Sequence, residues 1–180
     1  MRGGEAIFET ARSAVVFALG FSSEQYGQSP LAKLQRGCIG AGKGLVGMDG
    51  AGQAGMVLAE IARLDGAQRS AIIARFSPRF EICPCCGGQK PLEQWQTAVE
   101  HLAWVCVPAG VSNHRVRRGL VAKFFGASGI DFVSLGEQCN VHRKTVAAHY
   151  QVISKKLQEV EASAQTALYA ALQEKGMVSP

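Results

Sequence analysis

The chain of 180 residues has few aromatic side chains, which make up 7% of it, and few charged side chains, which make up 18%. It also lacks segments in which β-branched and polar residues alternate, so it does not predict an extensive half-buried sheet. Ala and Gly are plentiful instead, and 47% of the residues are hydrophobic, enough to bury an ordinary core. We therefore expect a folded, mostly α-helical protein with one domain, or with one domain and an appendage.

The N-terminus lacks a long apolar run. Residues 1–20 (MRGGEAIFETARSAVVFALG) carry Glu5 and Glu9 ahead of a short apolar stretch, which is too short and too charged for a signal peptide or a membrane-spanning helix. We expect a cytoplasmic protein with no membrane partner. In that compartment the six cysteines predict thiols or metal ligands and not a disulfide framework. Cys38 and Cys139 have apolar neighbours, which is typical of small buried residues.

Positive charge is unevenly distributed along the chain. The whole chain has a net charge of +5, whereas residues 114–157 alone contain eight basic and two acidic residues, and the remainder is slightly acidic. This asymmetry favours a surface that faces phosphate groups, although a solvated helix face would have the same composition. The basic residues of this stretch are Arg115, Arg117, Arg118, Lys123, Arg143, Lys144, Lys155 and Lys156.

Apolar spacing predicts helices over most of the chain. A helix over residues 5–19 is expected to end at Gly20, and the Gly- and Ser-rich stretch after it to be irregular until about Gln53. Further helices are predicted for residues 56–64, 67–76, 92–107, 112–125 and 142–175, with Ser112 as an N-cap and Gly126 as a helix end. We divide the sequence into an N-terminal helix with a flexible Gly-rich arm (1–50), a helical region with a CPCCGG knuckle (51–110), and a helix-turn-helix region with a long C-terminal helix (111–180).

Residues 135–146 meet the requirements of a helix-turn-helix unit. Two short helices that cross steeply need a small residue at their contact, a residue tolerant of left-handed backbone in the turn, and apolar residues on both inner faces. Gly136 would supply the contact and Asn140 the turn, since Asn adopts left-handed conformations more readily than most residues. An ordinary helical hairpin is the alternative. The inner faces would be formed by Leu135, Cys139, Val141 and Val146.

If Val146 points inward, the first turns of the second helix present other side chains outward. Basic groups there can reach phosphates and guanines, a glutamine can read an adenine edge, and alanines can lie against thymine methyl groups. The predicted DNA-binding residues are His142, Arg143, Lys144, Ala147, Ala148 and Gln151, with Arg115, Arg117 and Arg118 gripping phosphates.

The segment TVAAHYQVISKKL, residues 145–157, resembles the T-V-x-x-H-x-x-x-I-x-x-K-L signature of the recognition helix in LuxR/GerE-type regulators. That unit is close in shape to the last domain of bacterial sigma factors. The resemblance covers only the C-terminal part of the chain. It implies that His149 is a histidine packed on a helix face and not a catalyst.

Several motifs together resemble a second group of regulators. The segments SPLAKLQRG, QRSAIIARFSPRFEICPCCGG and HRVRRGLVAKFFG lead into the VHRKTVAAH helix. In this combination the chain resembles the Q-type transcription antitermination factors of phages and prophages, which include the AlpA-type lysis regulator of pseudomonads.

The resemblance to Q-type factors implies a protein that binds double-stranded DNA beside a promoter. It would load onto paused RNA polymerase with its sigma factor, and travel with the polymerase so that terminators are ignored. Nascent RNA would be a further partner. The alternative is a LuxR/GerE-like dimeric activator that acts at initiation.

The CPCCGG stretch, residues 83–88, predicts a metal-binding knuckle. Cys83 and Cys86 with Gly87 form a C-P-x-C-G pattern, in which two thiolates can bind zinc. A structural zinc needs four ligands, and no second C-x-x-C follows. A metal-free tight turn is therefore the alternative. The available completions are His101, Cys106 and His114, with Cys85 as a spare thiol.

Residues 37–44, GCIGAGKG, imitate a phosphate-binding loop, with Lys43 in the expected position. However, Gly44 stands where a magnesium-binding Ser or Thr is needed, and no buried strand precedes the loop. We expect a flexible arm, in which Arg36 and Lys43 are free to meet nucleic acid or a partner, and not a nucleotide hydrolase.

The sequence contains no Ser, His and Asp arrangement and no carboxylate pair that indicates catalysis, so we do not expect an enzyme. We interpret Trp95, Trp104, Phe124, Phe125 and Phe132 as core residues. A stripe with heptad spacing follows in the last helix, and packing within the chain is its commoner cause, with a dimer seam as the alternative. The stripe comprises Val146, Tyr150, Ile153, Leu157 and Val160, continued by Leu168 and Leu172.

Overall fold

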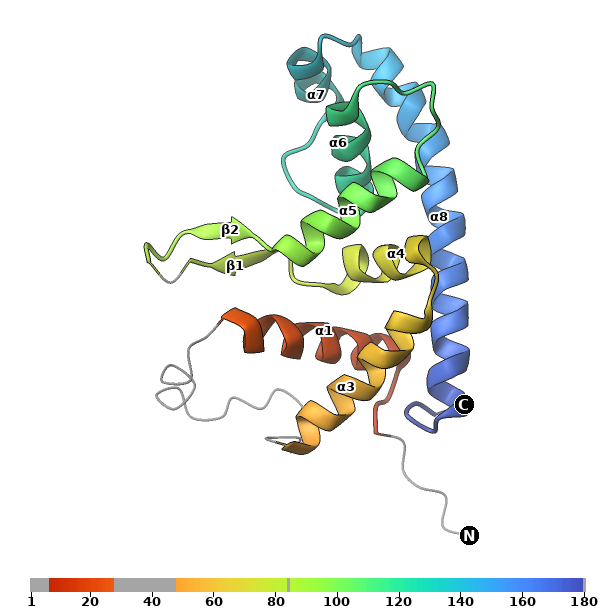
Figure 1. The fold of residues 1–180 in the computed structure, drawn as a ribbon. Helices are drawn as coiled ribbons and strands as arrows, with labels where there is room; N and C mark the ends of the chain where they lie inside the picture. The colour runs from red at the N-terminus through yellow and green to blue at the C-terminus, as the bar shows by residue number, and fades with distance from the viewer. Residues whose placement is uncertain (1–6, 28–47, 84, 180) are drawn as a thin grey trace. The chain divides into compact units, whose positions relative to one another are not determined.

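The computed structural model describes residues 7–27, 48–83 and 85–179 (Figure 1). Most of these residues are helical, which confirms the expected class. Within the described ranges, no helix combines the length and the apolar character needed to cross a membrane. The elements are α1 (Ala11–Gly27), α3 (Met48–Arg63), α4 (Gly66–Phe76), β1 (Phe80–Ile82), β2 (Gln89–Pro91), α5 (Glu93–Val105), α6 (His114–Phe124), α7 (Phe132–Cys139) and α8 (Arg143–Glu174).

These elements divide into two compact units that interleave along the chain. The first unit is drawn from residues 1–64, 76–91 and 167–180, and the second from residues 65–75 and 92–166. Helix α8 therefore contributes residues to both. The division of the sequence at residues 50 and 110 separates stretches of different composition, whereas each compact unit joins segments from several of those stretches.

In the first unit, α1 packs against α3 (Figure 1). Their contact buries Val15 and Leu19 of α1 and Val57 and Ile61 of α3. Glu60 of α3 is also buried, with 4% of its surface exposed. Its carboxylate lies 2.7 Å from Lys175 Nζ and 3.2 Å from Arg63 Nη1. The hydrogen bond from Lys175 lowers the pKa of Glu60. This ion pair, in which Glu60 is buried and Lys175 is 43% exposed, joins the residue after α8 to α3.

Two predicted boundaries in the first unit are wrong. Helix α1 begins at Ala11 and not at residue 5, because Thr10 and Ser13 form a reciprocal cap in which each hydroxyl accepts a hydrogen bond from the other's backbone N–H, at 3.0 and 3.2 Å. It also continues through Gly20 to Gly27. In this part of the helix the Phe21 ring lies 5.8 Å from the Phe17 ring, which in turn contacts the Phe8 ring.

The stretch expected to be irregular until Gln53 is helical from Met48 onward, as the first turn of α3. The preceding residues, 28–47, lie outside the described part of the chain, together with the predicted phosphate-loop imitation.

The cysteine-rich segment, which the sequence predicted as a knuckle or a tight turn, connects the two strands of a β-hairpin that the sequence did not predict. Strands β1 and β2 pair antiparallel, with Glu81 opposite Lys90. The Lys90 ammonium lies 2.8 Å from the Glu81 carboxylate, which ties the two strands together on one face. Each strand has only three residues and most of them are exposed, so the hydrophobic alternation that identifies strands is absent.

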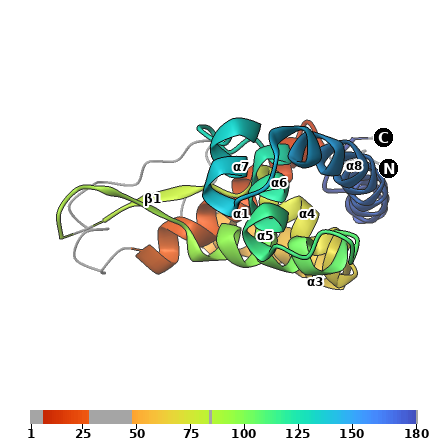
Figure 2. The ribbon, with the colours of Figure 1, turned by 90° about the horizontal axis from the view of Figure 1, so that it is seen from above.

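The second unit packs α5, α6, α7 and the first part of α8 around one core. Helix α6 lies beside both α5 and α7 (Figure 2). Helix α7 and the start of α8 form the end of the unit opposite α4 (Figure 1). The core is closely packed, and its fully buried members include Val99, Leu102, Val116, Leu120, Phe125, Val146, Ile153 and Leu157.

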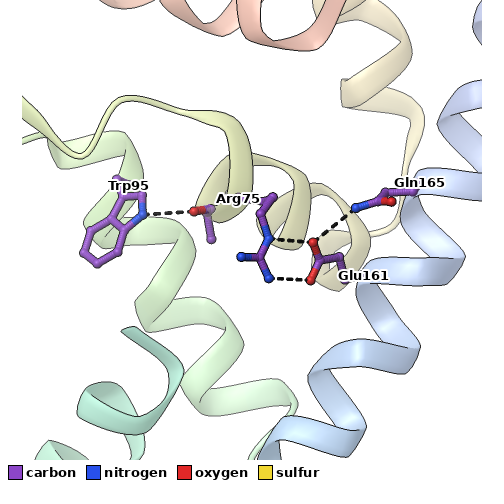
Figure 3. A network of polar contacts seen from close by, with 5 residues as sticks. Arg75, Trp95, Glu161 and Gln165 are labelled. Carbon is purple, nitrogen blue, oxygen red and sulfur yellow. Dashed lines mark hydrogen bonds and ion pairs between the residues drawn. The ribbon is translucent and has the colours of Figure 1, made fainter. Parts of the chain in front are cut away.

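A polar network crosses the middle of this unit (Figure 3). Arg75 of α4 makes a two-pronged ion pair with Glu161 of α8, at 2.6 and 2.7 Å, and Gln165 donates to the same carboxylate at 3.1 Å. The Arg75 guanidinium also lies 5.0 Å from the ring of Phe125. Because both oxygens of the carboxylate are bonded, the network fixes α4 against α8 within this unit.

Two details of the second unit correct the predictions, and a third confirms one. Asn113 and not Ser112 caps α6, since its side chain accepts hydrogen bonds from the N–H groups of Arg115 and Val116. Trp104 is not a core residue, because 64% of its surface is exposed. Trp95, in contrast, is buried as expected, and its indole N–H donates to the Ala74 carbonyl at 3.0 Å.

Candidate nucleic-acid interface and cysteine cluster

In the connection between α7 and α8, Asn140 forms the turn and Gly136 makes the close contact, the two roles that the sequence assigned to these residues. The carboxylate of Asp131 caps α7 by accepting the N–H groups of Val133 and Ser134, both at 2.7 Å. Asn140 ends the helix with φ 53° and ψ 46°, the left-handed conformation. A Cβ on Gly136 would lie 2.6 Å from the carbonyl oxygen of Val141, a distance that side chains do not tolerate. The turn therefore requires glycine at position 136.

The first turns of α8 separate an inner from an outer face. Val146 is fully buried in the core, and Leu135 of α7 is also buried. Within the described residues, neither Arg143 nor Lys144 makes an ion pair, so both side chains are available to an external anion. We call the outward set the α8 tip: His142, Arg143, Lys144, Ala148 and Gln151 are exposed, and Ala147 is half-buried.

His142 also caps α8. Its carbonyl accepts from Thr145 N–H at 2.9 Å and Val146 N–H at 3.1 Å, and its ring Nδ1 accepts from Lys144 N–H at 3.3 Å. These bonds occupy the imidazole's Nδ1 with the backbone and leave Nε2 for another partner. His149, two turns further along, is half-buried on the helix face.

The predicted phosphate-gripping arginines of α6 differ in their surroundings. Arg117 folds back on its own chain, where its Nε donates to the Val111 carbonyl and its Nη2 lies 3.3 Å from the Pro108 carbonyl oxygen. Arg118 Nε lies 3.7 Å from the Glu100 carboxylate. Arg115 is exposed on the first turn of α6. Arg115 is therefore the arginine of this group best placed to reach a phosphate freely.

Three cysteine thiols gather at the tip of the hairpin. Cys83, Cys85 and Cys86 have sulfur atoms within 4.8 Å of one another, and the Sγ atoms of Cys83 and Cys85 are 2.8 Å apart. The hairpin closes through the N–H of Cys83, which donates to the Gly88 carbonyl at 2.7 Å, and through Gly87, whose φ of 70° favours glycine. The three thiols could hold a metal ion. Cys85, which the sequence interpretation treated as a spare, belongs to the cluster.

The electrostatics of the cluster favour a thiolate at one position. The Cys85 thiol hydrogen bonds to Cys83 and lowers the pKa of Cys83 to about 7, with the backbone N–H groups of Cys85 and Cys86 adding to the effect. The same bond raises the pKa of Cys85, because that thiol is the donor. A thiolate is the form that binds metal ions, so Cys83 is prepared to be the first ligand.

The three residues considered for completing a zinc site belong to the second unit and are engaged there. His101 Nδ1 lies 2.9 Å from the Ser70 hydroxyl, and His114 Nε2 lies 2.6 Å from the Glu100 carboxylate. Cys106 is buried, and burial raises the pKa of its thiol. Cys139 is partly buried against the core, and Cys38 lies outside the described residues.

A groove of about 550 Å³ beside α4 and α5 contains the Ser70 and His101 pair. Arg69 and Glu93 also line it. Among the described residues, no carboxylate hydrogen bonds to the His101 ring, so the pair lacks the acidic group that orients a catalytic histidine. Sequence reasoning did not bring these two residues together, because they lie on different helices.

The sequence interpretation also missed a surface cluster around Trp104, at the end of α5. The indole lies 5.5 Å from the His114 ring and 5.8 Å from the Arg117 guanidinium. A signal was present, because the buried residues Val99, Leu102 and Cys106 follow a helical repeat that leaves position 104 on the opposite face.

Comparison with protein-family models, curated proteins and solved structures finds no match to this chain. The resemblance to Q-type and LuxR/GerE-type regulators is therefore limited to short sequence motifs.

Proposed function

We propose that this protein is a DNA-binding transcription regulator of the cytoplasm, whose α8 tip enters the major groove of duplex DNA. The observation that carries the proposal is the turn at Asn140. A left-handed Asn140, a Gly136 in contact with backbone and a buried Val146 together direct the α8 tip outward. A helix-turn-helix that reads DNA requires this arrangement, with the N-terminal residues of its second helix facing the base edges.

The chemistry of the α8 tip supports duplex recognition. Arg143 and Lys144 can bind guanine or phosphate, Gln151 can bind adenine, and Ala147 and Ala148 are small enough to allow close approach to thymine methyl groups. The helix start also presents the positive end of the α8 dipole. We infer that Arg143 reads a base, since its position in the first turn lies where recognition helices contact base edges.

Selection of duplex oligonucleotides from a random pool, followed by affinity measurement, tests this proposal. Arg143→Ala should weaken the selected site by about 1 to 3 kcal/mol and relax specificity at one base pair. Lys155→Ala is the matched control, because it removes one positive charge from the same helix away from the tip. Equal losses on selected and unrelated duplexes would reject base reading by Arg143. Failure to retain any duplex at moderate salt would reject the proposal as a whole.

We propose further that the regulator acts as a Q-like antitermination factor on RNA polymerase and its sigma factor. The support is the set of motifs that resembles this group. A transcription assay with a terminator placed downstream of the selected site separates the modes of action. Read-through that requires the site and the protein is expected, whereas increased initiation with normal termination would indicate an activator.

The dimeric activator has less support from the structure of α8. Val146, Ile153 and Leu157 belong to the heptad-spaced stripe, and all three are 0% exposed within a single chain. They pack in the core of the second unit, so they are not available for a dimer seam.

We also infer that Cys83, Cys85 and Cys86 hold a structural zinc ion. Zinc prefers thiolate ligands at about 2.3 Å, and the three sulfur atoms are close enough to surround one ion after small side-chain rotations. Such an ion would stabilise the hairpin tip, where two strands of three residues offer little packing of their own.

Elemental analysis of purified protein tests the zinc proposal. About one zinc ion per chain is expected, with loss in Cys83→Ser and retention in the control Cys139→Ser. Zinc affinity should fall as the pH drops, first because protons compete for Cys85, whose thiol pKa is raised, and more steeply below about 7, where they also compete for the Cys83 thiolate. Retention of zinc by Cys83→Ser would reject this ligand set.

A further inference from the structure

Trp104 is a large aromatic side chain left in solvent. It lies at the end of α5 with 64% of its surface exposed, and its neighbour Val105 is 57% exposed. Leaving most of an indole in water forgoes the burial that usually stabilises a folded chain. The other tryptophan, Trp95, is buried with its N–H bonded to a carbonyl. Trp104 and Val105 expose adjacent apolar side chains, and an apolar patch rimmed by polar residues is a candidate binding surface.

The indole is held in a fixed setting of positive and aromatic groups. Arg117 lies 5.8 Å from the ring centroid, and three carbonyl groups of the α5–α6 connection, those of Pro108, Ala109 and Val111, hold its guanidinium in place. His114 lies 5.5 Å from the indole with its plane tilted by 35°. The Glu100 carboxylate, 2.6 Å from His114 Nε2, in turn orients the imidazole. The ring is therefore presented by groups that are themselves anchored.

The charge around the ring is positive. Arg115, Arg117 and Arg118 lie on the first turns of α6, and among the described residues Glu100 is the acidic group that pairs with this cluster. Glu100 contacts His114 and Arg118 and leaves Arg115 without an ion pair in the described part of the chain. A ligand for this surface should carry negative charge together with a flat aromatic group.

We propose that Trp104, His114, Arg115, Arg117 and Arg118, here called the Trp104 platform, bind single-stranded nucleic acid. An unpaired base stacks on the indole, and Arg115 and Arg118 contact the neighbouring phosphates. Stacking on an aromatic side chain beside a basic groove is the general mode of single-strand binding, because every base has a flat face. A base within a duplex cannot stack in this way, since its faces are covered by its neighbours. This inference does not depend on duplex reading by the α8 tip.

Tryptophan fluorescence tests the platform directly, because the chain has two tryptophans and only Trp104 is exposed. Titration with short oligomers of uridine RNA and thymidine DNA at low salt should quench the emission. In Trp104→Phe, which leaves Trp95 as the fluorophore, quenching should be absent. Trp104→Ala should weaken binding by about 5- to 150-fold, the range expected for the loss of one stacked base. The melting temperature of each variant checks that the fold is retained.

The two oligomers distinguish the sources of the single strand. Tighter binding of RNA would assign the platform to a transcript, tighter binding of DNA would assign it to a melted duplex, and equal binding would assign it to both. Arg143→Ala should leave the binding of both oligomers unchanged, which separates this surface from the α8 tip. Absence of quenching by both oligomers would overturn the proposal. So would an emission shift that depends only on protein concentration, since a second copy of the chain would then cover Trp104.

Discussion

The α8 tip and the Trp104 platform are both basic surfaces of the second unit, but they hold their arginines differently. At the tip, Arg143 extends from a first helical turn beside two alanines and makes no ion pair with a described residue. On the platform, three backbone carbonyls hold Arg117 beside an exposed indole. The tip carries no Trp, Tyr or Phe, which suits a groove, whereas the platform offers an exposed indole, which suits an unpaired base.

This difference shows why net charge alone does not identify a partner. The sequence interpretation assigned Arg115, Arg117 and Arg118 to the same duplex as Arg143, because all four belong to one positively charged stretch. Their surroundings differ by one tryptophan and by the bonds that hold Arg117. Charge predicts that phosphates are bound, whereas the groups between the charges determine which nucleic acid presents them.

The largest effect should follow from Gly136→Val, which disrupts the turn that directs the α8 tip. The new Cβ would lie 2.6 Å from the Val141 carbonyl oxygen, so the backbone must shift, at a cost of about 3 kcal/mol in the free energy of unfolding. Gly55→Val is the matched control, because that helical glycine has no atom within 4 Å of its Cβ position. Chemical denaturation measures both. Equal stability of the two variants would contradict the close contact.

A smaller effect is expected from Glu161→Ala, which removes the ion pair that holds α4 against α8 in the second unit. The substitution leaves Arg75 without its two-pronged partner, and because Arg75 is 31% exposed we expect a loss of about 2 kcal/mol, less than for a fully buried pair. Glu159→Ala removes an exposed carboxylate 3.6 Å from Lys156 on the same helix and should cost less than about 0.5 kcal/mol. Thermal denaturation compares them. Comparable losses of stability in the two variants would mean that the Arg75–Glu161 ion pair stabilises the fold no more than an exposed surface pair does.

Local sequence signals were sufficient for the α7–α8 connection. Asn140, Gly136 and Val146 are close in sequence, and the requirements of the turn act between neighbours. Gly119 had no such signal, since its Cβ position lies 2.8 Å from Leu135 of a different helix. The same reason hid the Ser70 and His101 pair. The hairpin was missed because its three-residue strands are shorter than the four or more alternating residues that identify a strand. Its tip brings the Cys85 thiol close to those of Cys83 and Cys86.

Trp104 was misassigned for a different reason. Residue type favoured the core, since tryptophan is usually well buried, while its position on α5 opposed it. Position prevailed because the α5 face with Val99 and Leu102 already fills the core of the second unit. A large apolar residue on the solvent-facing side of a helix is a candidate for a binding surface, and Trp104 is such a residue.

Testing one variant of each surface against both kinds of nucleic acid shows whether the α8 tip and the Trp104 platform bind different ligands. Arg143→Ala should weaken the selected duplex by about 1 to 3 kcal/mol and leave single strands unaffected. Trp104→Ala should do the reverse. Fluorescence anisotropy of labelled duplex and single-stranded oligomers provides the four values under one condition. If each variant weakened both ligands, the tip and the platform would form one continuous surface, and the distinction drawn above would be wrong.

The smallest effect concerns salt, and it distinguishes arginines that bind phosphate from one that positions a ring. Each phosphate contact adds about 0.7 to the slope of log affinity against log salt for a single strand. Arg115→Ala should lower this slope by that amount, measured by titrations at several salt concentrations. Arg117→Ala should reduce affinity with little change in slope, because carbonyls already occupy the Arg117 donors and its role is to hold Trp104. Equal changes in slope would mean that Arg117 leaves its carbonyls to bind a phosphate.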